Sequence, residues 1–385
     1  MSKLLSNEVL FLANPVRNEI LLDNFLEADL QKFLLPLNFI QQMMFSPKYC
    51  IRYNFITPNS RIANCIYICS TFCVIITYIY IIIIDTAILQ FPSNLYVILI
   101  FNSCITTFGW ITNAINNVIQ SDLNIDFILK FQKIQKFTHI TYRQFVTGNW
   151  IHVLVIILFY IVICSSYAVL GGLNLRWILA CFPLLLADLD IIYMIRMIKF
   201  LRCNIVIWNM KLKHTYEVSV IHHAPLAAKR VDEGNKMKNA LIEVLDASDI
   251  YKKICSIPIL YYTVLTFGQS LSNVQAVIMF SEITVVIGMF LMWAVKNIVL
   301  LVLISFECEN FFITLKNTQI VLLMSQVKEC SVEERLVYKS LLRACRASSE
   351  AMSACGVVSV DAKLPLRLLS VLVTYTIVLL QFAFL

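Results

Sequence analysis

The sequence ends in an apolar stretch that carries a single amide, TYTIVLLQFAFL at positions 374–385. Its Leu, Ile, Val and Phe residues are typical of a helix inside a lipid bilayer. A helix that contacts only lipid has no use for an amide, because each polar group in hydrocarbon needs a partner or water. We therefore expect Gln381 to face protein or a water-filled path.

The composition places the rest of the chain in the same environment. Hydrophobic residues make up 59% of the 385 residues, the mean hydropathy is +0.77, and only 14% of the residues are charged. Soluble domains are about 45–50% apolar and about 25% charged. The predicted fold class is therefore an all-α membrane protein.

A membrane-spanning helix needs about 20 mainly apolar residues, and seven stretches of the chain meet this requirement. The predicted spans are Ile62–Ile84, Leu95–Ile115, Ile151–Leu170, Trp177–Ile198, Cys255–Phe280, Ile283–Phe306 and Leu364–Leu385. The predicted organisation is a cytoplasmic segment 1–61, helices one to four in 62–198, a cytoplasmic segment 199–253, helices five and six in 254–306, a cytoplasmic segment 307–363 and helix seven in 364–385.

The distribution of Lys and Arg sets the predicted orientation. Most of these residues lie in segments 1–61, 116–150, 199–253 and 307–363, whereas loop 85–94 holds none. Basic loops stay in the cytoplasm, so we expect the N-terminus inside and the C-terminus outside. The net charge of +7 follows from this bias, and we expect no nucleic-acid partner.

Segments 199–253 and 307–363 carry apolar residues at helical spacing. One stripe is Met237, Leu241, Val244, Leu245 and Ser248, and the other is Val337, Leu341, Ala344, Cys345, Ser348 and Met352. Ser331 and Glu334 have the spacing of a capping box, which marks a helix start. We expect helices that extend spans four to six below the membrane as an anchor; two loose loops are the alternative.

Metal and cofactor chemistry finds no support in the sequence. The thirteen cysteines include no C-x-x-C spacing, and the five histidines form no ligand pattern. Cys65, Cys69 and Cys73 are expected to be small apolar residues in a helix seam. The sequence predicts no metal, no cofactor and no enzymatic activity.

Two other classes of membrane protein are disfavoured. A G-protein-coupled receptor also has seven spans, but its N-terminus lies outside. A secondary transporter would show an inverted repeat and helices broken by Gly or Pro, and no repeat is visible here. Both classes remain alternatives to be tested.

The residues before and within the last predicted span resemble the C-terminal signature of insect gustatory receptors. They are Ala354-Cys355-Gly356, Asp361, Leu366-Arg367-Leu368-Leu369, Thr374-Tyr375 and, five residues later, Gln381-Phe382. The family motif proper corresponds to Thr374, Tyr375, Gln381 and Phe382. The number of spans, their orientation and the chain length agree with the same family.

This resemblance implies a tetrameric, ligand-gated cation channel related in fold to the insect olfactory receptors. Four copies of the last span would surround one pore, and the other six spans would bind a tastant in their outward half. The last span would be split, with Ala344–Val360 as its cytoplasmic half. The implied partners are a small-molecule tastant, other copies of the chain, membrane lipid and permeant cations. A homotetramer is expected, with a heteromer as the alternative, in the plasma membrane of sensory neurons.

The last span has one face at a 3-4-3-4 spacing. It consists of Val371, Thr374, Val378, Gln381 and Leu385, and Phe382 lies at the same outer end. By the resemblance, Gln381, Phe382, Val378, Thr374 and Leu385 are the pore and gate residues. A buried amide bonded to a neighbouring helix is the alternative for Gln381.

Three residues are expected to contact the surroundings of the last span. Tyr375 points to another face and is expected to pack against spans five and six. Asp361 and Arg367 flank the start of the span. We expect them to form an ion pair with a helix of the cytoplasmic anchor. A role of Asp361 in attracting cations is the alternative.

Polar and aromatic residues in the other spans are the ligand-site candidates. They are Asn102, Ser103, Asp188, Ser166, Tyr167, Trp177, Gln269, Asn273, Trp293 and Lys296. A buried Lys296 needs an opposite charge, so we expect a pair with Asp188 or Asp190. That pair is either structural or part of a water-filled pocket. A bitter plant compound is favoured as the ligand, and a sugar is the alternative.

Overall fold

The computed structural model describes residues 24–44, 46–89, 93–138, 143–171, 175–221, 227–279, 284–327 and 332–384. Within these ranges only the backbone is described at 81–89, 93–99, 167–171, 175–180, 215–221, 227–233, 279, 284–286, 327 and 382–384. The structure is 87% helical, which agrees with the predicted all-α class.

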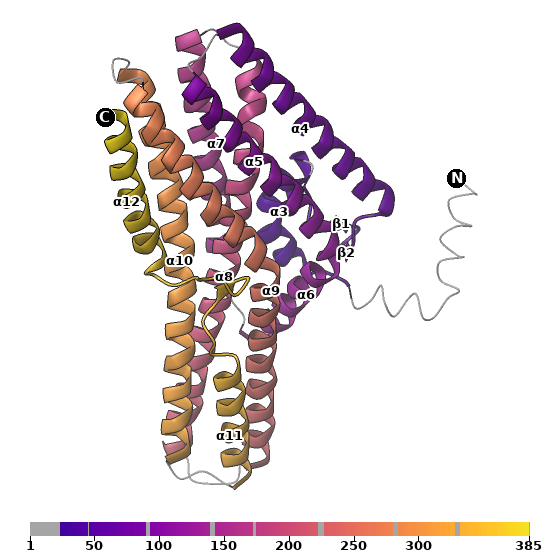
Figure 1. Ribbon diagram of the computed structural model, residues 1–385. Helices are drawn as coiled ribbons and strands as arrows, with labels where there is room; N and C mark the ends of the chain where they lie inside the picture. Colours follow the sequence, from indigo (N-terminus) through magenta and orange to yellow (C-terminus); the bar gives the residue numbers. More distant parts are fainter. Residues whose placement is uncertain are drawn as a thin grey trace, which may run out of the picture.

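Long helices follow one another along the chain, with two short hairpins between them (Figure 1). The helices are α3 (Ala28–Met43), α4 (Arg61–Leu89), α5 (Ser93–Ile119), α6 (Ser121–Thr138), α7 (Arg143–Gly171), α8 (Leu175–Ile221), α9 (Ala227–Met279), α10 (Thr284–Val327), α11 (Val332–Ala347) and α12 (Leu364–Phe384). The strands are β1 (Cys50–Arg52), β2 (Phe55–Thr57), β3 (Ser353–Ala354) and β4 (Val358–Ser359).

Five helices of the described part are long and apolar enough to cross a membrane. The candidate spans are Arg61–Tyr80, Arg143–Ser166, Gly234–Ile278, Ile287–Gln326 and Leu364–Gln381. The two other predicted spans fall on α5 and α8, so every predicted span coincides with a helix. The protein is therefore a helical, membrane-embedded protein.

Helices α8, α9 and α10 run side by side along most of the molecule, and α11 joins them at one end (Figure 1). Each of the three helices continues beyond its predicted span, whereas the cytoplasmic location of these extensions stays a prediction. The stripe on α9 is buried from Met237 to Ser248, and Leu341 and Cys345 of α11 are buried with it. The predicted cap at Ser331 lies outside the described residues.

Helix α6 is attached to α9 by charge as well as by packing. The ammonium of Lys130 lies 3.2 Å from Glu243 and 3.3 Å from Asp246. Burial alone would lower the pKa of Lys130, but these two carboxylates raise it on balance. Lys130 therefore stays charged and holds α6 against α9.

The segment before the first predicted span is part of the core. Helix α3 packs on α7 and α8, and Leu30, Phe33 and Leu34 are fully buried. The hairpin β1–β2 follows, with positive φ at both turn residues, Tyr53 and Asn54. Two-residue turns of this kind match the twist of paired strands. The N-terminal segment thus contributes a helix and a hairpin to the bundle.

The segment before α12 differs from the expectation for Ala344–Val360. Helix α11 ends at Ala347, and the antiparallel hairpin β3–β4 follows it. Its turn residues Cys355 and Gly356 have φ values of 52° and 72°, and Val357 N donates to Ala354 O at 3.0 Å. The A-C-G sequence is therefore a tight turn, with Gly at a position where a side chain would be strained.

Gly109→Ala is expected to destabilise the protein by about 1–3 kcal/mol, because overpacking forces neighbouring groups to move. A Cβ at Gly109 would lie 1.5 Å from Cε2 of Tyr261, where α5 meets α9. Gly288→Ala in α10 is the matched control, since no atom lies within 4 Å of its Cβ position. The measurement is the thermal midpoint of the purified protein in detergent. Equal midpoints for the two variants would contradict the close approach.

Candidate functional site

The predicted cross-helix ion pair forms between α10 and α8. The ammonium of Lys296 lies 2.6 Å from Asp188 Oδ2, and Asp188 is 1% exposed. Asp188 also accepts hydrogen bonds from Tyr160 of α7 at 2.7 Å and from Tyr262 of α9 at 3.1 Å. Side chains from four helices therefore meet at one carboxylate.

Aromatic rings surround the Lys296 ammonium on its other sides. Its Nζ atom lies 4.8 Å from the ring centre of Trp293, 5.7 Å from Tyr160 and 5.8 Å from Phe159. These rings also contact one another, with centroids 5.5–5.7 Å apart. An ammonium gains about 0.5–2 kcal/mol from such a ring. The Asp188–Lys296 site thus pairs a buried cation with both a carboxylate and an aromatic wall.

Gln269 of α9 extends the site. Its Oε1 atom accepts from Trp293 Nε1 at 3.2 Å and from Asn297 Nδ2 at 2.7 Å. Trp293 therefore contacts both the side-chain amide of Gln269 and the ammonium of Lys296. The structure therefore joins four of the predicted ligand residues, Asp188, Gln269, Trp293 and Lys296, in one connected group.

The remaining ligand-site candidates lie elsewhere or stay untested. Asn273 Nδ2 is 3.5 Å from the carbonyl of Phe290, and Ser166 donates to Val162 O of its own helix. Asn102 and Ser103 lie on α5, where Ser103 is buried and forms a side-chain hydrogen bond with Tyr78. The side chains of Tyr167 and Trp177 lie outside the described residues.

Asp190 belongs to a second buried group, which the sequence did not reveal. Its Oδ1 atom lies 3.0 Å from Lys48 Nζ and 3.2 Å from Gln41 Nε2, and Asn113 donates to Oδ2. Lys48 also donates to Asn117 at 3.0 Å. The Lys48–Asp190 pair is buried, with both side chains 4% exposed. Several amides in one apolar helix were the available signal, since such groups need partners.

A small cavity lies beside Asp190, with a volume of about 10 Å³. Asn113, Tyr261 and Tyr262 are among its lining residues. That volume is close to the smallest that holds one water molecule. It is too small for an organic ligand, so this group is a structural connection between the N-terminal segment and the bundle.

Helix α12 packs on α9 and α10 along one seam. Leu364 and Leu372 are buried there, and Leu368 is half-buried between them. Tyr375 confirms part of its expectation, because its ring lies 5.8 Å from Phe267 of α9. Among the described side chains, most of the others on α12 are exposed.

The uncovered side of α12 carries the predicted pore residues. Val371 is 45% and Val378 39% exposed, and Thr374 and Gln381 are also exposed. At about 100° per residue, Thr374 and Gln381 lie about 120–180° from Leu368 and Leu372, whereas Val371 and Val378 lie at the edge of the seam. The exposed side chains of Arg367 and Ser370 fall on the same side as Thr374 and Gln381. We call Arg367, Ser370, Thr374 and Gln381 the polar stripe. The Phe382 side chain and Leu385 lie outside the described residues.

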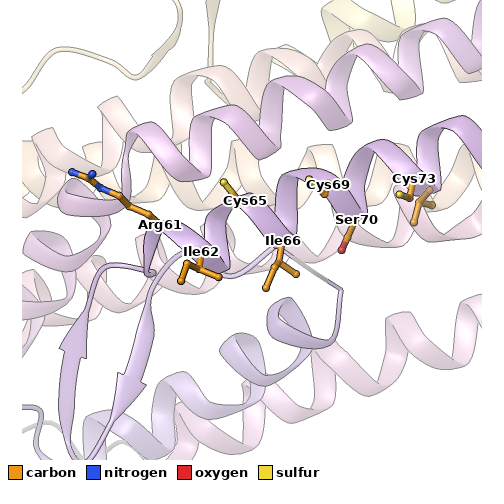
Figure 2. Close-up of a pocket in the computed structure, with 8 residues that line it drawn as sticks. Arg61, Ile62, Cys65, Ile66, Cys69, Ser70 and Cys73 are labelled. Carbon is orange, nitrogen blue, oxygen red and sulfur yellow. The ribbon is translucent and has the colours of Figure 1, made fainter.

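A shallow groove of about 620 Å³ runs along α4 (Figure 2). It is lined by Arg61, Ile62, Cys65, Ile66, Cys69, Ser70, Cys73 and Val74. All of these residues come from one helix, so the groove is an open helix face and no convergent polar groups define a site. Cys65, Cys69 and Cys73 are exposed, and the expectation that they fill a helix seam is wrong for the single chain.

Within the described ranges, no group of three or more His, Cys, Asp or Glu side chains could hold a metal ion. Comparison with known proteins gives no further assignment. No protein-family model matches the chain, and no curated protein matches it.

Proposed function

We propose that this protein is a gustatory receptor of the insect type that acts as a tastant-gated, non-selective cation channel. In this proposal it has seven spans, with the N-terminus inside, and depolarises a sensory neuron from the plasma membrane. The motif Thr374-Tyr375-x5-Gln381-Phe382 supports the family. The observation that carries the channel function is the polar stripe on the uncovered side of α12.

The polar stripe needs water or another protein surface. Polar side chains that face lipid are costly, and membrane helices bury them against protein or a water-filled cavity. The seam with α9 and α10 is on the other side of α12, and the side chains of the stripe are exposed in the described part of the chain. Closed rotational symmetry presents the same face of every copy to a central axis. A homotetramer around α12 then gives one water-filled path; a heteromer is the alternative.

The residues at the outer end of α12 suit a gate. Val378 and Gln381 lie on the exposed face one turn apart. A ring of apolar side chains closes a pore by dewetting, and it conducts when the helices move apart. In this proposal Val378 supplies the apolar ring, and Gln381 forms hydrogen bonds that differ between closed and open states.

The Asp188–Lys296 site is the proposed ligand-sensing group. It joins α7, α8, α9 and α10, and α12 packs on two of these helices. A small organic ligand that alters the contacts within this group therefore moves α9 and α10, the helices on which α12 packs. Aromatic walls with a few fixed polar groups suit an apolar plant compound, which favours a bitter ligand over a sugar.

Expression of the chain alone in cells that lack other taste receptors tests the proposal. Ligand-evoked cation current that persists in excised patches without GTP supports the channel. Current that requires GTP points to a G-protein-coupled receptor instead. Solute uptake without current, across panels of bitter compounds and sugars, points to a transporter.

Gln381→Ala is expected to change the basal open fraction by about fivefold, because a typical hydrogen bond contributes about 1 kcal/mol. The measurement is leak current per channel at the cell surface. Thr77→Ala is the matched control, since it also removes an exposed polar group from an apolar helix, α4. Unchanged leak and gating in Gln381→Ala would argue for an amide that only bonds to a neighbouring helix.

A further inference from the structure

Arg367 is the charged member of the polar stripe, and it is held in place at the start of α12. Its Nη2 atom donates to Ser359 O at 3.2 Å and to Ser359 Oγ at 2.9 Å. The same atom donates to Asp361 Oδ1. The side chain of Arg367 is 51% exposed and that of Asp361 30%. The guanidinium is therefore paired, yet it remains open to solvent.

Asp361 is fixed by the backbone on both sides of the pair. Its carboxylate accepts from Lys363 N at 3.1 Å, and its carbonyl accepts from Leu364 N at 3.0 Å, where α12 begins. Asp361 therefore pairs with Arg367. The expectation that these residues pair with an anchor helix is wrong. An exposed ion pair contributes little to stability. The net charge of the pair therefore matters more than its contribution to folding.

The position of the pair decides which ions it meets. Arg367 lies one turn from the cytoplasmic start of α12, on the side that carries Thr374 and Gln381. In the proposed tetramer, four copies of Arg367 ring the inner mouth of the pore. Four unpaired guanidinium groups would repel cations and attract anions, since a mouth lined by one sign of charge changes the local ion concentration. Asp361 cancels each of these charges.

We propose that the Asp361–Arg367 pair sets the charge selectivity of the pore by neutralising the ring of arginines at its inner mouth. This inference rests on the proposed channel function and deepens it. The side chain of Asp361 acts on the permeant ions through Arg367, whereas that of Arg367 faces the ions directly. The pair therefore predicts opposite effects of removing its two members.

The experiment measures the reversal potential of ligand-evoked current in a NaCl gradient and converts it to a sodium-to-chloride permeability ratio. Asp361→Asn is expected to lower this ratio by about threefold or more, because it leaves the arginine ring unpaired. Arg367→Gln is expected to raise the ratio, because it leaves the Asp361 carboxylates without their cations. The double variant should return the ratio to about the wild-type value, since neither charge of the pair remains. Arg346→Gln on α11 removes a cation from the same cytoplasmic region and serves as the control.

The outcomes separate this inference from the channel proposal. Wild-type current together with equal permeability ratios in Asp361→Asn and Arg367→Gln overturns the selectivity role alone. Absence of any wild-type current overturns both. If Asp361→Asn fails to reach the cell surface because α12 loses its cap, Arg367→Gln and Arg367→Glu decide the question. A permeability ratio that falls in Arg367→Glu would contradict the proposal.

Discussion

Asp188→Ala is expected to destabilise the protein by about 3–5 kcal/mol, because it leaves the Lys296 ammonium buried without a counter-charge. Lys296 is held by Asp188 at 2.6 Å, with side-chain exposures of 8% and 1%. Tyr160 and Tyr262 lose their acceptor in the same variant. The measurement is the midpoint of thermal unfolding in detergent, followed by tryptophan fluorescence.

The double variant Asp188→Asn/Lys296→Met is expected to recover most of this loss. Replacing a buried ion pair by groups of similar volume is often neutral, whereas breaking it is not. Asp29→Ala is the control, because its pair with Lys32 is about two-thirds exposed and such pairs contribute less than about 1 kcal/mol. Equal losses in Asp188→Ala and Asp29→Ala would show that the buried pair contributes no more than the exposed one.

The same variants separate a structural role from a ligand role. If the proposed channel function holds, the folded double variant should still conduct, because α12 packs on α9 and α10 through apolar side chains. If the site only holds the helices together, the ligand concentration for half-maximal current stays unchanged. If the ligand contacts Asp188 or Lys296, that concentration rises while the maximal current remains.

The helices could be predicted because their signals are local. Each predicted span coincides with a helix, since an apolar run long enough to cross a bilayer is visible in the sequence itself. Helix α3 was missed because its 16 residues are too few for a span and include Pro36. The turn at Cys355-Gly356 differs from the expectation because the resemblance implies a helix over Ala344–Val360, whereas both turn residues have positive φ. The apolar residues Leu30, Phe33, Leu34, Leu37 and Ile40 follow a helical period, so the signal for α3 was present in the sequence.

The ion pair could be predicted in part for an electrostatic reason. A lysine in a span requires an opposite charge, and Asp188 and Asp190 were the available acids in span four. Their spacing puts them about 200° apart around a helix, so only one could meet Lys296. Which of the two acids pairs with Lys296 depends on the rotation of α8 about its axis. The pair of Lys48 with Asp190 fixes that rotation. The sequence does not reveal this pair, because it depends on how segments far apart in the chain pack.

Lys48→Met is expected to destabilise the protein by about 3–5 kcal/mol, for the same reason as a broken pair at Asp188. It leaves Asp190 buried with amide partners only, from Gln41 and Asn113. Because Lys48 belongs to the segment that contains α3 and β1–β2, its loss should also expose that segment. The measurement is proteolysis of residues 24–60 under native conditions, compared with the unfolding midpoint.

Lys32→Met provides the matched control for this prediction. Lys32 lies on α3 itself, and its side chain is 69% exposed, so its loss should change neither the midpoint nor the cleavage rate. Asp190→Asn in addition to Lys48→Met should restore much of the stability, because the remaining amide can still bond to Asn113 without a buried charge. Early cleavage of the segment in Lys48→Met alone would show that one ion pair fastens the N-terminal helix into the bundle. A cleavage rate in Lys48→Met equal to that of the wild type would contradict this role. It would show that the apolar face of α3, with Leu30, Phe33 and Leu34 at 0% exposure, holds the segment in the bundle without the ion pair.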